Sequence, residues 1–173
     1  MNISKLKLEG IFLIEPEIKI DSRGSFMESF RKDVLSEYFK KEFVQDNLVE
    51  SNKGVLRGLH FQLDNPQDKL VQVLDGEIFD VAVDIREKSS TYGKWFGISL
   101  SCKNKKQLLV PAGYAHGYCV LSETAKVLYK CTEYYCPEDQ HGYIWNDATL
   151  NINWPIKNPK ISIKDSQLQN FKK

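Results

Sequence analysis

The chain has 173 residues, a length that fits one domain or at most two small ones. Its 24 Lys and Arg residues nearly balance its 23 Asp and Glu residues, and the net charge of +1 offers no electrostatic attraction to nucleic acid or to an anionic membrane. Hydrophobic residues make up 42% of the chain, with only 10 Gly and 6 Pro, so the composition excludes a largely disordered or fibrous protein.

The sequence contains no apolar run near the roughly 18 residues that a membrane span requires. Residues 1–9 alternate in charge where a secretory signal would be apolar, so we expect an unprocessed cytoplasmic protein. The four cysteines lack the paired spacing of a zinc site, and we expect them to be reduced.

Most of the chain alternates polar and apolar residues with period two, and turn-forming residues interrupt the pattern at intervals of roughly 8 to 12 residues. This pattern predicts a mainly β fold, a sandwich or barrel, in one domain over residues 1–173. Asp75-Gly76 lies between two runs rich in β-branched residues and predicts a tight hairpin turn. The expected strands are Ile11–Ile14, Ser25–Phe30, Phe43–Glu50, Val55–Gln62, Leu70–Leu74, Glu77–Ile85, Trp95–Ser101, Gln107–Val110, Gly117–Leu121 and Ala125–Tyr135.

Little helix is expected. Asp33 is predicted to cap one short helix over Val34–Lys40, because apolar residues recur there at helical spacing. The tail from Trp154 carries Pro155 and Pro159, so we expect it to wrap the surface or to form a short helix.

A candidate motif with the spacing P-x-G-x-x-H runs from Pro111 to His116 and is typical of the second motif of cupin jelly rolls. The first cupin motif would supply H-x-H, but Gln62 follows His60 where the second imidazole should stand. With only three histidines in the chain, a set of three protein ligands for zinc or iron is hard to assemble. We therefore predict a cupin-type jelly roll without a metal, which relies on organic acid and base groups.

Several side chains are candidates for that chemistry. Alternation in the strand Ala125–Tyr135 places Tyr129 and Tyr135 on one face, and a tyrosine close to a lysine can serve as an acid. Lys69 begins a strand and is a candidate for holding a developing oxyanion.

Arg57 and His60 lie three positions apart, so a regular strand would place them on opposite faces. Gly58 permits a β-bulge that brings both to one side, and we predict that bulge. Asp80 and Asp84 alternate along another strand and are expected to face either water or a polar pocket.

A series of longer motifs spans almost the whole chain. They are D-S-R-G-S-F-M-E-S-F (21–30), Q-D-N (45–47), G-V-L-R-G-L-H-F-Q (54–62), D-V-A-V-D-I-R (80–86), Y-G-K-W (92–95), P-A-G-Y-A-H-G (111–117), Y-K-C-T (129–132), W-N-D (145–147) and S-I-K-D (162–165). Together they resemble the dTDP-4-dehydrorhamnose 3,5-epimerase family, nucleotide-sugar epimerases of the cupin superfamily. The resemblance implies a jelly roll with a few short helices, no cofactor, a homodimer formed by exchange of N-terminal strands, and a role in dTDP-rhamnose supply for lipopolysaccharide or capsule.

The resemblance also implies the roles of four catalytic residues. A ketone at C4 of the sugar acidifies the hydrogens on the adjacent carbons, and His60 matches the family's base that removes one of them. Asp165 matches the carboxylate that orients this imidazole, and Lys69 matches the residue that supports the enolate oxygen. Tyr129 matches the acid that returns a proton from the opposite face of the ring.

Further positions match family residues that hold the nucleotide sugar. Arginine suits a diphosphate because its planar fork bonds two oxygens at once. The implied substrate-binding residues are Arg23, Glu28, Gln45, Asn47, Arg57, His116, Tyr135 and Lys164.

The chain departs from the family at Val49, where serine is common, and at Tyr114 and Tyr118, where phenylalanine is usual. A dTDP-linked 6-deoxy-4-keto-hexose is the expected substrate, and a GDP-linked 6-deoxy-4-keto-heptose is the alternative. Inversion at C3, C5 or both stays open, as does a 3,4-ketoisomerase. Outside this class, a metal-dependent cupin enzyme that uses His60 and His116 and a non-catalytic sugar-binding jelly roll are the competing hypotheses.

Overall fold

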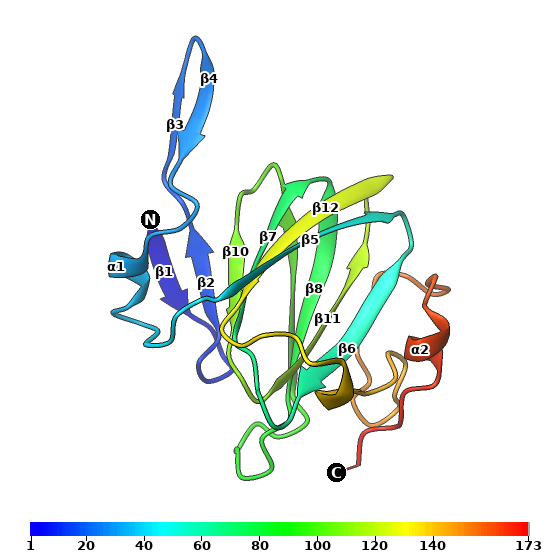
Figure 1. The fold of residues 1–173 in the computed structure, drawn as a ribbon. Helices are drawn as coiled ribbons and strands as arrows, with labels where there is room; N and C mark the ends of the chain where they lie inside the picture. The colour runs from blue at the N-terminus through cyan, green and yellow to red at the C-terminus, as the bar shows by residue number, and fades with distance from the viewer. Residues whose placement is uncertain (173) are drawn as a thin grey trace.

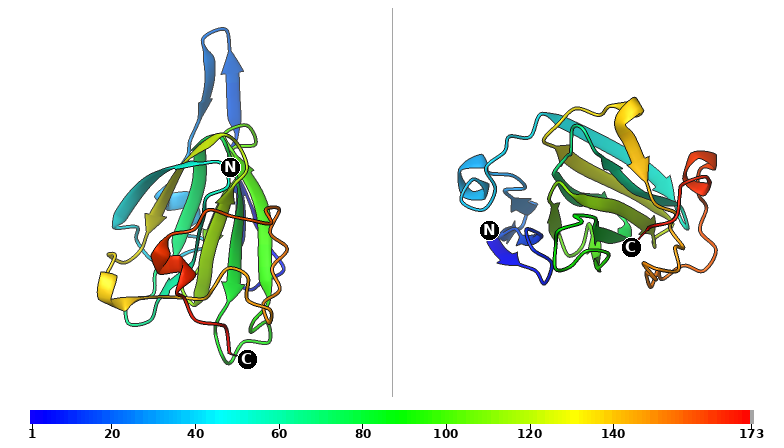
Figure 2. Two further views of the ribbon diagram at one scale, coloured as in Figure 1. Left: turned by 90° about the vertical axis from the view of Figure 1, so that its right-hand side faces the viewer. Right: turned by 90° about the horizontal axis from the view of Figure 1, so that it is seen from below.

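The computed structural model describes residues 1–172 and shows two antiparallel β-sheets packed face to face (Figure 1, Figure 2). The expected mainly β, cupin-type jelly roll is confirmed. The six-stranded sheet contains, in spatial order, β1 (Asn2–Lys5), β2 (Phe12–Glu15), β10 (Gln107–Val110), β7 (Lys69–Asp75), β12 (Thr124–Cys131) and β5 (Gln45–Asn52). The five-stranded sheet contains β13 (Gln140–Gly142), β6 (Leu56–Gln62), β11 (Tyr114–Val120), β8 (Glu77–Asp84) and β9 (Trp95–Ser101). Among the described residues, no helix is long and apolar enough to cross a membrane.

The turn at Asp75-Gly76 carries the chain from one sheet to the other. Strand β7 ends there in the six-stranded sheet, and β8 begins in the five-stranded one, so the predicted hairpin is wrong. Gly76 adopts a φ of +77°, and its carbonyl accepts a hydrogen bond from the Cys102 N–H at 3.0 Å. The sequence signal correctly marks a sharp turn, but it carries no information on which strands pair afterwards.

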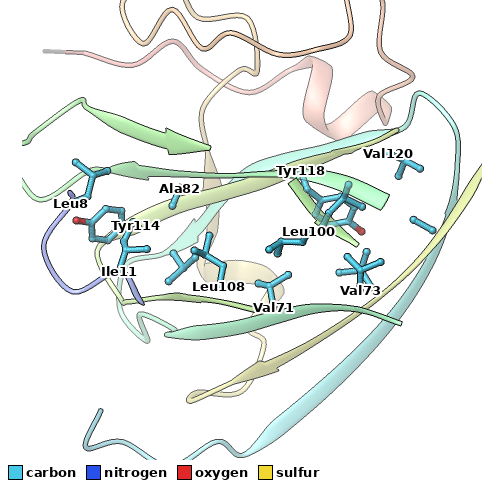
Figure 3. Close-up of a cluster of buried hydrophobic side chains, with 14 residues drawn as sticks. Leu8, Ile11, Val71, Val73, Ala82, Leu100, Leu108, Tyr114, Tyr118 and Val120 are labelled. Carbon is cyan, nitrogen blue, oxygen red and sulfur yellow. The ribbon is translucent and has the colours of Figure 1, made fainter. Parts of the chain in front are cut away.

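The main apolar core fills the space between the two sheets (Figure 3). Its burial supplies the main driving force that holds the sheets together. Toward one end of the barrel, the inward-facing side chains become polar. On β7, Lys69 lies next to Val71 on the same face, and on β11 the inward-facing row passes from Val120 through Tyr118 to His116. The fold therefore creates a polar chamber beside an apolar core. The core residues are Leu8, Ile11, Val71, Val73, Ile78, Ala82, Leu100, Leu108, Val110, Tyr114, Tyr118, Val120, Ala125 and Val127.

A separate hairpin of β3 (Ile18–Asp21) and β4 (Gly24–Met27) projects away from the two sheets (Figure 1). The predicted strand Ser25–Phe30 is therefore shifted and too long, and the pattern missed β1 and β3. Both strands of the hairpin are exposed, with Ile20 80% and Phe26 64% accessible. Strand β3 alternates apolar and polar residues (I-K-I-D), but it is only four residues long and neither of its faces is buried, and β4 (G-S-F-M) does not alternate, so the pattern gave a poor guide to both strands.

The helical segments are short. Helix α1 covers Lys32–Leu35, so the predicted helix over Val34–Lys40 is wrong in extent. Asp33 does not cap the helix: it lies within α1, and its carboxylate pairs with Arg31. Beyond α1, Phe39 stacks on Phe43 and directs the chain into β5.

The tail confirms both expectations for it, because it wraps the barrel and forms α2 (Ile163–Ser166) beside β6 (Figure 1). A 3-10 turn, η1 (Pro137–Asp139), precedes β13. All four cysteines are free thiols.

Strand β12 ends at Cys131, earlier than the predicted end at Tyr135. Beyond Cys131, Thr132 is tied to Asp68: its hydroxyl accepts a hydrogen bond from the Asp68 N–H at 2.9 Å and donates one to the Asp68 carboxylate at 3.0 Å, and the chain then leaves the sheet. Tyr135 therefore reaches the site from a loop. Most other predicted strands agree within a few residues, and Trp95–Ser101 and Gln107–Val110 agree fully.

The predicted bulge at Gly58 is confirmed. Across β6 and β11, His60 pairs with His116 and Arg57 pairs with Tyr118, so two residues of β6 lie opposite Gly117 alone. Gly58 has a φ of +116°, and a Cβ on it would lie 2.6 Å from the Gly117 Cα. The bulge brings Arg57 and His60 to the same cavity despite their odd spacing.

We predict that Gly58→Ala lowers the free energy of unfolding by about 2–4 kcal/mol, because the new methyl group collides with backbone and the positive φ disfavours a side chain. Urea unfolding measures this loss. Gly54→Ala is the matched control: Gly54 also has a positive φ, +79°, but open space around its Cβ position. Equal losses in the two variants would show that the close approach of the strands is not what requires Gly58.

Candidate active site

A cavity of about 670 Å³ occupies the polar end of the barrel. The inner faces of β5, β6, β7, β11 and β12 form its walls, and residues 160–165 of the tail close one side. All but two of the predicted site residues line this one cavity. Those that do are His60, Tyr129, Asp165, Lys69, Gln45, Asn47, Arg57, His116, Tyr135 and Lys164.

Arg23 and Glu28 are the exceptions. Arg23 lies at the tip of the β3–β4 hairpin and pairs with Asp21 at 2.7 Å, while Glu28 follows that hairpin and lies 3.7 Å from Arg31. Within the described residues of one chain, neither of the two lines the cavity.

His60 and Asp165 form an imidazole–carboxylate pair, in which His60 Nε2 lies 2.8 Å from Asp165 Oδ1. The His60 side chain is one-quarter exposed and the Asp165 carboxylate is buried. With Nε2–H donating to the carboxylate, the neutral ring carries its lone pair on Nδ1, where it can accept a proton. The pair therefore has the arrangement of a general base and the group that orients it.

Hydrogen bonds hold Asp165 in place through both its backbone and its carboxylate. The Asp165 N–H donates to the Ser162 hydroxyl, the cap of α2, at 2.9 Å, and Asp165 Oδ2 accepts the Gly58 N–H at 3.3 Å. Burial raises the pKa of Asp165, but the hydrogen bonds from His60, Gly58 and Ser162 outweigh it and hold that pKa below its ordinary value. Asp165 is therefore an anion at neutral pH and accepts the hydrogen bond that orients His60.

A second imidazole–carboxylate pair lies deeper. His116 Nε2 is 2.8 Å from Asp80 Oδ1, and Asp80 is completely buried. Asp80 does not face water, and it contacts the cavity only through His116. Asp84 faces neither water nor the cavity, because Arg86 holds its carboxylate at 2.8 Å.

Lys69 and Tyr129 have shifted acidities. Burial lowers the pKa of the Lys69 ammonium against the opposing attraction of Cys131 and Asp80. Burial also raises the pKa of the Tyr129 phenol, and the nearby Arg57 cation only partly offsets this. Tyr129 therefore stays protonated at neutral pH and can serve as an acid. Lys69 supplies N–H donors in a partly dry chamber, as stabilisation of an oxyanion requires.

Amide and aromatic side chains surround the mouth of the cavity. Gln45 Oε1 accepts the Tyr135 N–H at 2.9 Å, and Gln45 Nε2 donates to Asn47 at 3.0 Å. Gln140 accepts hydrogen bonds from the Tyr135 hydroxyl and, at 3.1 Å, from the Lys164 ammonium. This rim offers donors, acceptors and a flat ring to a nucleotide.

Sequence reasoning missed Gln140 and the pairing of His116 with Asp80. Gln140 begins β13, a strand of three residues that is too short to give a periodic signal. The partnership of Asp80 with His116 joins residues 36 positions apart, although the alternation on β8 had allowed for a polar pocket. Within residues 1–172, no three His, Cys, Asp or Glu side chains converge as the ligands of a metal would.

The fold and the cavity define a jelly-roll protein built for acid–base chemistry. An imidazole from one sheet and a phenol from the other line a common cavity that also holds a partly buried lysine.

Comparison with known proteins gives the family. The model of the dTDP-4-dehydrorhamnose 3,5-epimerase family matches residues 5–173, so the chain belongs to that family. It is 49% identical to the dTDP-4-dehydrorhamnose 3,5-epimerase of Shigella flexneri, over 99% of this chain and 96% of the relative.

Two solved structures are similar over nearly the whole fold. A 3,5-epimerase from Legionella pneumophila in complex with dTDP-4-keto-L-rhamnose has a TM-score of 0.95 at 46% identity, with coverage of 98% of this chain and 92% of the other. The enzyme from Bacillus anthracis, with TDP and pyrophosphate bound, has a TM-score of 0.94 at 42% identity, with coverage of 98% and 100%.

We predict that Asp165→Asn lowers kcat by about 10²-fold, because the amide no longer orients His60 or stabilises its charged form. Steady-state kinetics with the dTDP-sugar measures this loss.

The effect of Asp165→Asn on the free energy of unfolding should also depend on pH. Since the native pKa of Asp165 lies below 3.8, its ionised form stabilises the protein above that pH, and the effect is lost as pH falls through the native pKa. The difference in unfolding free energy between wild type and variant should therefore be constant near neutral pH and shrink in acid. Urea unfolding across this range would contradict the assignment if the difference stayed constant.

Proposed function

We propose that this protein inverts C3, C5 or both in a dTDP-linked 6-deoxy-4-keto sugar. The observation that carries the proposal is that His60, backed by Asp165, and Tyr129 approach one cavity from opposite sheets. Inversion requires removal of a proton from one face of a carbon and its return from the other, and groups on opposite walls suit this need.

The chemistry follows from the residues. Nδ1 of His60 takes the hydrogen from the carbon next to the ketone, and the C–H electron pair forms the enolate. Lys69 donates a hydrogen bond to the enolate oxygen as its charge develops. Tyr129 then transfers its phenolic proton to the same carbon from the opposite side, which inverts the centre.

The relatives support dTDP as the nucleotide, since a similar structure holds dTDP-4-keto-L-rhamnose and another holds TDP. A GDP-linked heptose is the alternative substrate for the same residues. We propose that catalysis needs no metal or other cofactor, because His60 and His116 each bind a carboxylate through Nε2. We place the enzyme in the cytoplasm, in the supply of dTDP-rhamnose for lipopolysaccharide or capsule, and treat residues 1–173 as one domain.

We further propose a homodimer in which the β3–β4 hairpin packs against the partner and presents Arg23 and Glu28 to the partner's cavity. The hairpin projects from its own chain, and its exposed Ile20 and Phe26 give it an apolar surface to bury (Figure 1). This arrangement accounts for two predicted substrate-binding residues that lie outside their own cavity.

Removal of the base should stop proton exchange. In heavy water, the wild type incubated with a dTDP-6-deoxy-4-keto-hexose is expected to incorporate deuterium at C3 or C5, and His60→Ala to reduce this rate by at least about 10²-fold. Nuclear magnetic resonance measures the exchange carbon by carbon and separates epimerisation from ketone migration. His141→Ala is the matched control, since His141 lies outside the cavity and should leave exchange unchanged.

The same assay separates the competing functions. Exchange that survives a chelator fits the metal-free proposal, whereas its loss on chelation would favour a metal-dependent cupin enzyme. Binding of nucleotide sugar without exchange by the wild type would indicate a sugar-binding jelly roll. Retained exchange in His60→Ala would remove His60 from the role of base.

Strand exchange predicts complementation between two impaired variants. Arg23→Ala and His60→Ala homodimers should both have low activity, but a mixed dimer contains one cavity with its own His60 and the partner's Arg23. Coexpression of the two variants, followed by isolation of the mixed dimer, should restore part of the wild-type kcat/KM. No recovery in a verified mixed dimer would contradict the exchange of hairpins.

A further inference from the structure

We propose that Tyr118 is a substrate-binding residue whose hydroxyl donates a hydrogen bond to an oxygen of the bound nucleotide sugar. The proposal rests on the function above and deepens it, by adding a contact that none of the predicted site residues supplies.

The Tyr118 hydroxyl is buried and makes no hydrogen bond within the described residues, although Tyr118 lines the cavity. Its side chain lies between the sheets on β11, two residues beyond His116 and opposite Arg57 on β6 (Figure 3). A buried phenol without a partner costs folding free energy, because it has lost its hydrogen bonds to water. A ligand that supplies the missing acceptor removes this cost when it binds.

Another tyrosine on the same strand, Tyr114, has a hydroxyl with hydrogen-bond partners inside the protein. Tyr114 also faces inward, and its hydroxyl donates to the Glu9 carbonyl at 2.9 Å and accepts from Arg86 at 3.0 Å. The contrast with Tyr118 is that Tyr114 does not line the cavity. Of the two tyrosines, the one whose hydroxyl lacks a partner therefore lines the substrate chamber, and the one whose hydroxyl is satisfied does not.

The surroundings of Tyr118 suit an oxygen-rich ligand. The Ser51 hydroxyl lies close enough to Tyr118 to oppose the rise in the pKa of the phenol, but it accepts the Nε–H of Arg57 at 3.1 Å and is too poorly aligned to satisfy the Tyr118 hydroxyl. This bond uses Nε of Arg57, so the terminal nitrogens of the guanidinium are available to a ligand. Burial raises the pKa of Tyr118 to about 12, so the phenol keeps its proton and acts as a donor.

Two oxygens of the substrate fit this chemistry. One belongs to the diphosphate, which the Arg57 guanidinium would hold, and the other belongs to the sugar, which must lie close to Tyr129. Binding of dTDP alone, compared with that of the complete dTDP-sugar, distinguishes them.

The experiment compares Tyr118→Phe with the wild type. Phenylalanine fills the same space, and it is the residue usual at this position in the family that the sequence resembles. We expect Tyr118→Phe to raise the Kd for the dTDP-sugar about tenfold, as loss of one hydrogen bond to a ligand does. Its melting temperature should be equal to or above that of the wild type, because the variant removes an unsatisfied buried group. A weakened affinity for dTDP as well assigns the bond to the diphosphate, and a loss confined to the dTDP-sugar assigns it to the sugar.

Tyr114→Phe is the matched control, with the opposite expectation: a lower melting temperature and an unchanged Kd for the dTDP-sugar. An unchanged Kd in Tyr118→Phe would overturn the proposal. So would a clear fall in its melting temperature, since this would show that the hydroxyl has a partner within the protein. Deuterium exchange by the wild type reports on the proposed function separately, so its failure is distinguishable from that of the Tyr118 assignment.

Discussion

The site depends on one carboxylate that joins two distant parts of the chain. Asp165 binds His60 through one oxygen and the Gly58 N–H through the other, so the same side chain orients the imidazole and holds the bulge that directs it. The bulge forms because Gly58 and Gly117 allow the two backbones to approach closely. Without the bulge, the three-residue spacing of Arg57 and His60 would send them to opposite faces of β6. The carboxylate and the two glycines thus act together to place a cation and a base in one chamber.

Burial and hydrogen bonding set the pKa values of the ionisable side chains in that chamber. Burial raises the pKa of Tyr129 and lowers that of Lys69, so both shifts disfavour the charged forms. Asp165 differs, because its hydrogen bonds overcome burial and keep it ionised. An imidazole beside a fixed anion and a phenol kept neutral by desolvation suit the proton exchange between two faces that we propose.

Sequence reasoning recovered most of the strands, which depend on local alternation, and most of the chamber residues, which are carried by motifs that resemble those of the family. The strands Trp95–Ser101 and Gln107–Val110 and the Gly58 bulge follow from periodicity and from one permissive glycine. Its errors have physical causes. The turn at Asp75-Gly76 looks the same whether the next strand pairs with the last one or enters the other sheet. The partnership of Asp80 with His116 depends on packing between strands, which one sequence does not display.

The route of the chain also affects the timing of biosynthesis. A growing polypeptide that has emerged as far as β13 already contains every strand of both sheets, yet it lacks the carboxylate 105 positions after His60. Such a nascent barrel can collapse around its apolar core, but its imidazole has no anion to orient it. Contacts of this sequence separation form late, since closing a long loop is entropically costly. The orientation of the His60 ring is therefore completed only when the tail docks, as the last step in the assembly of the barrel.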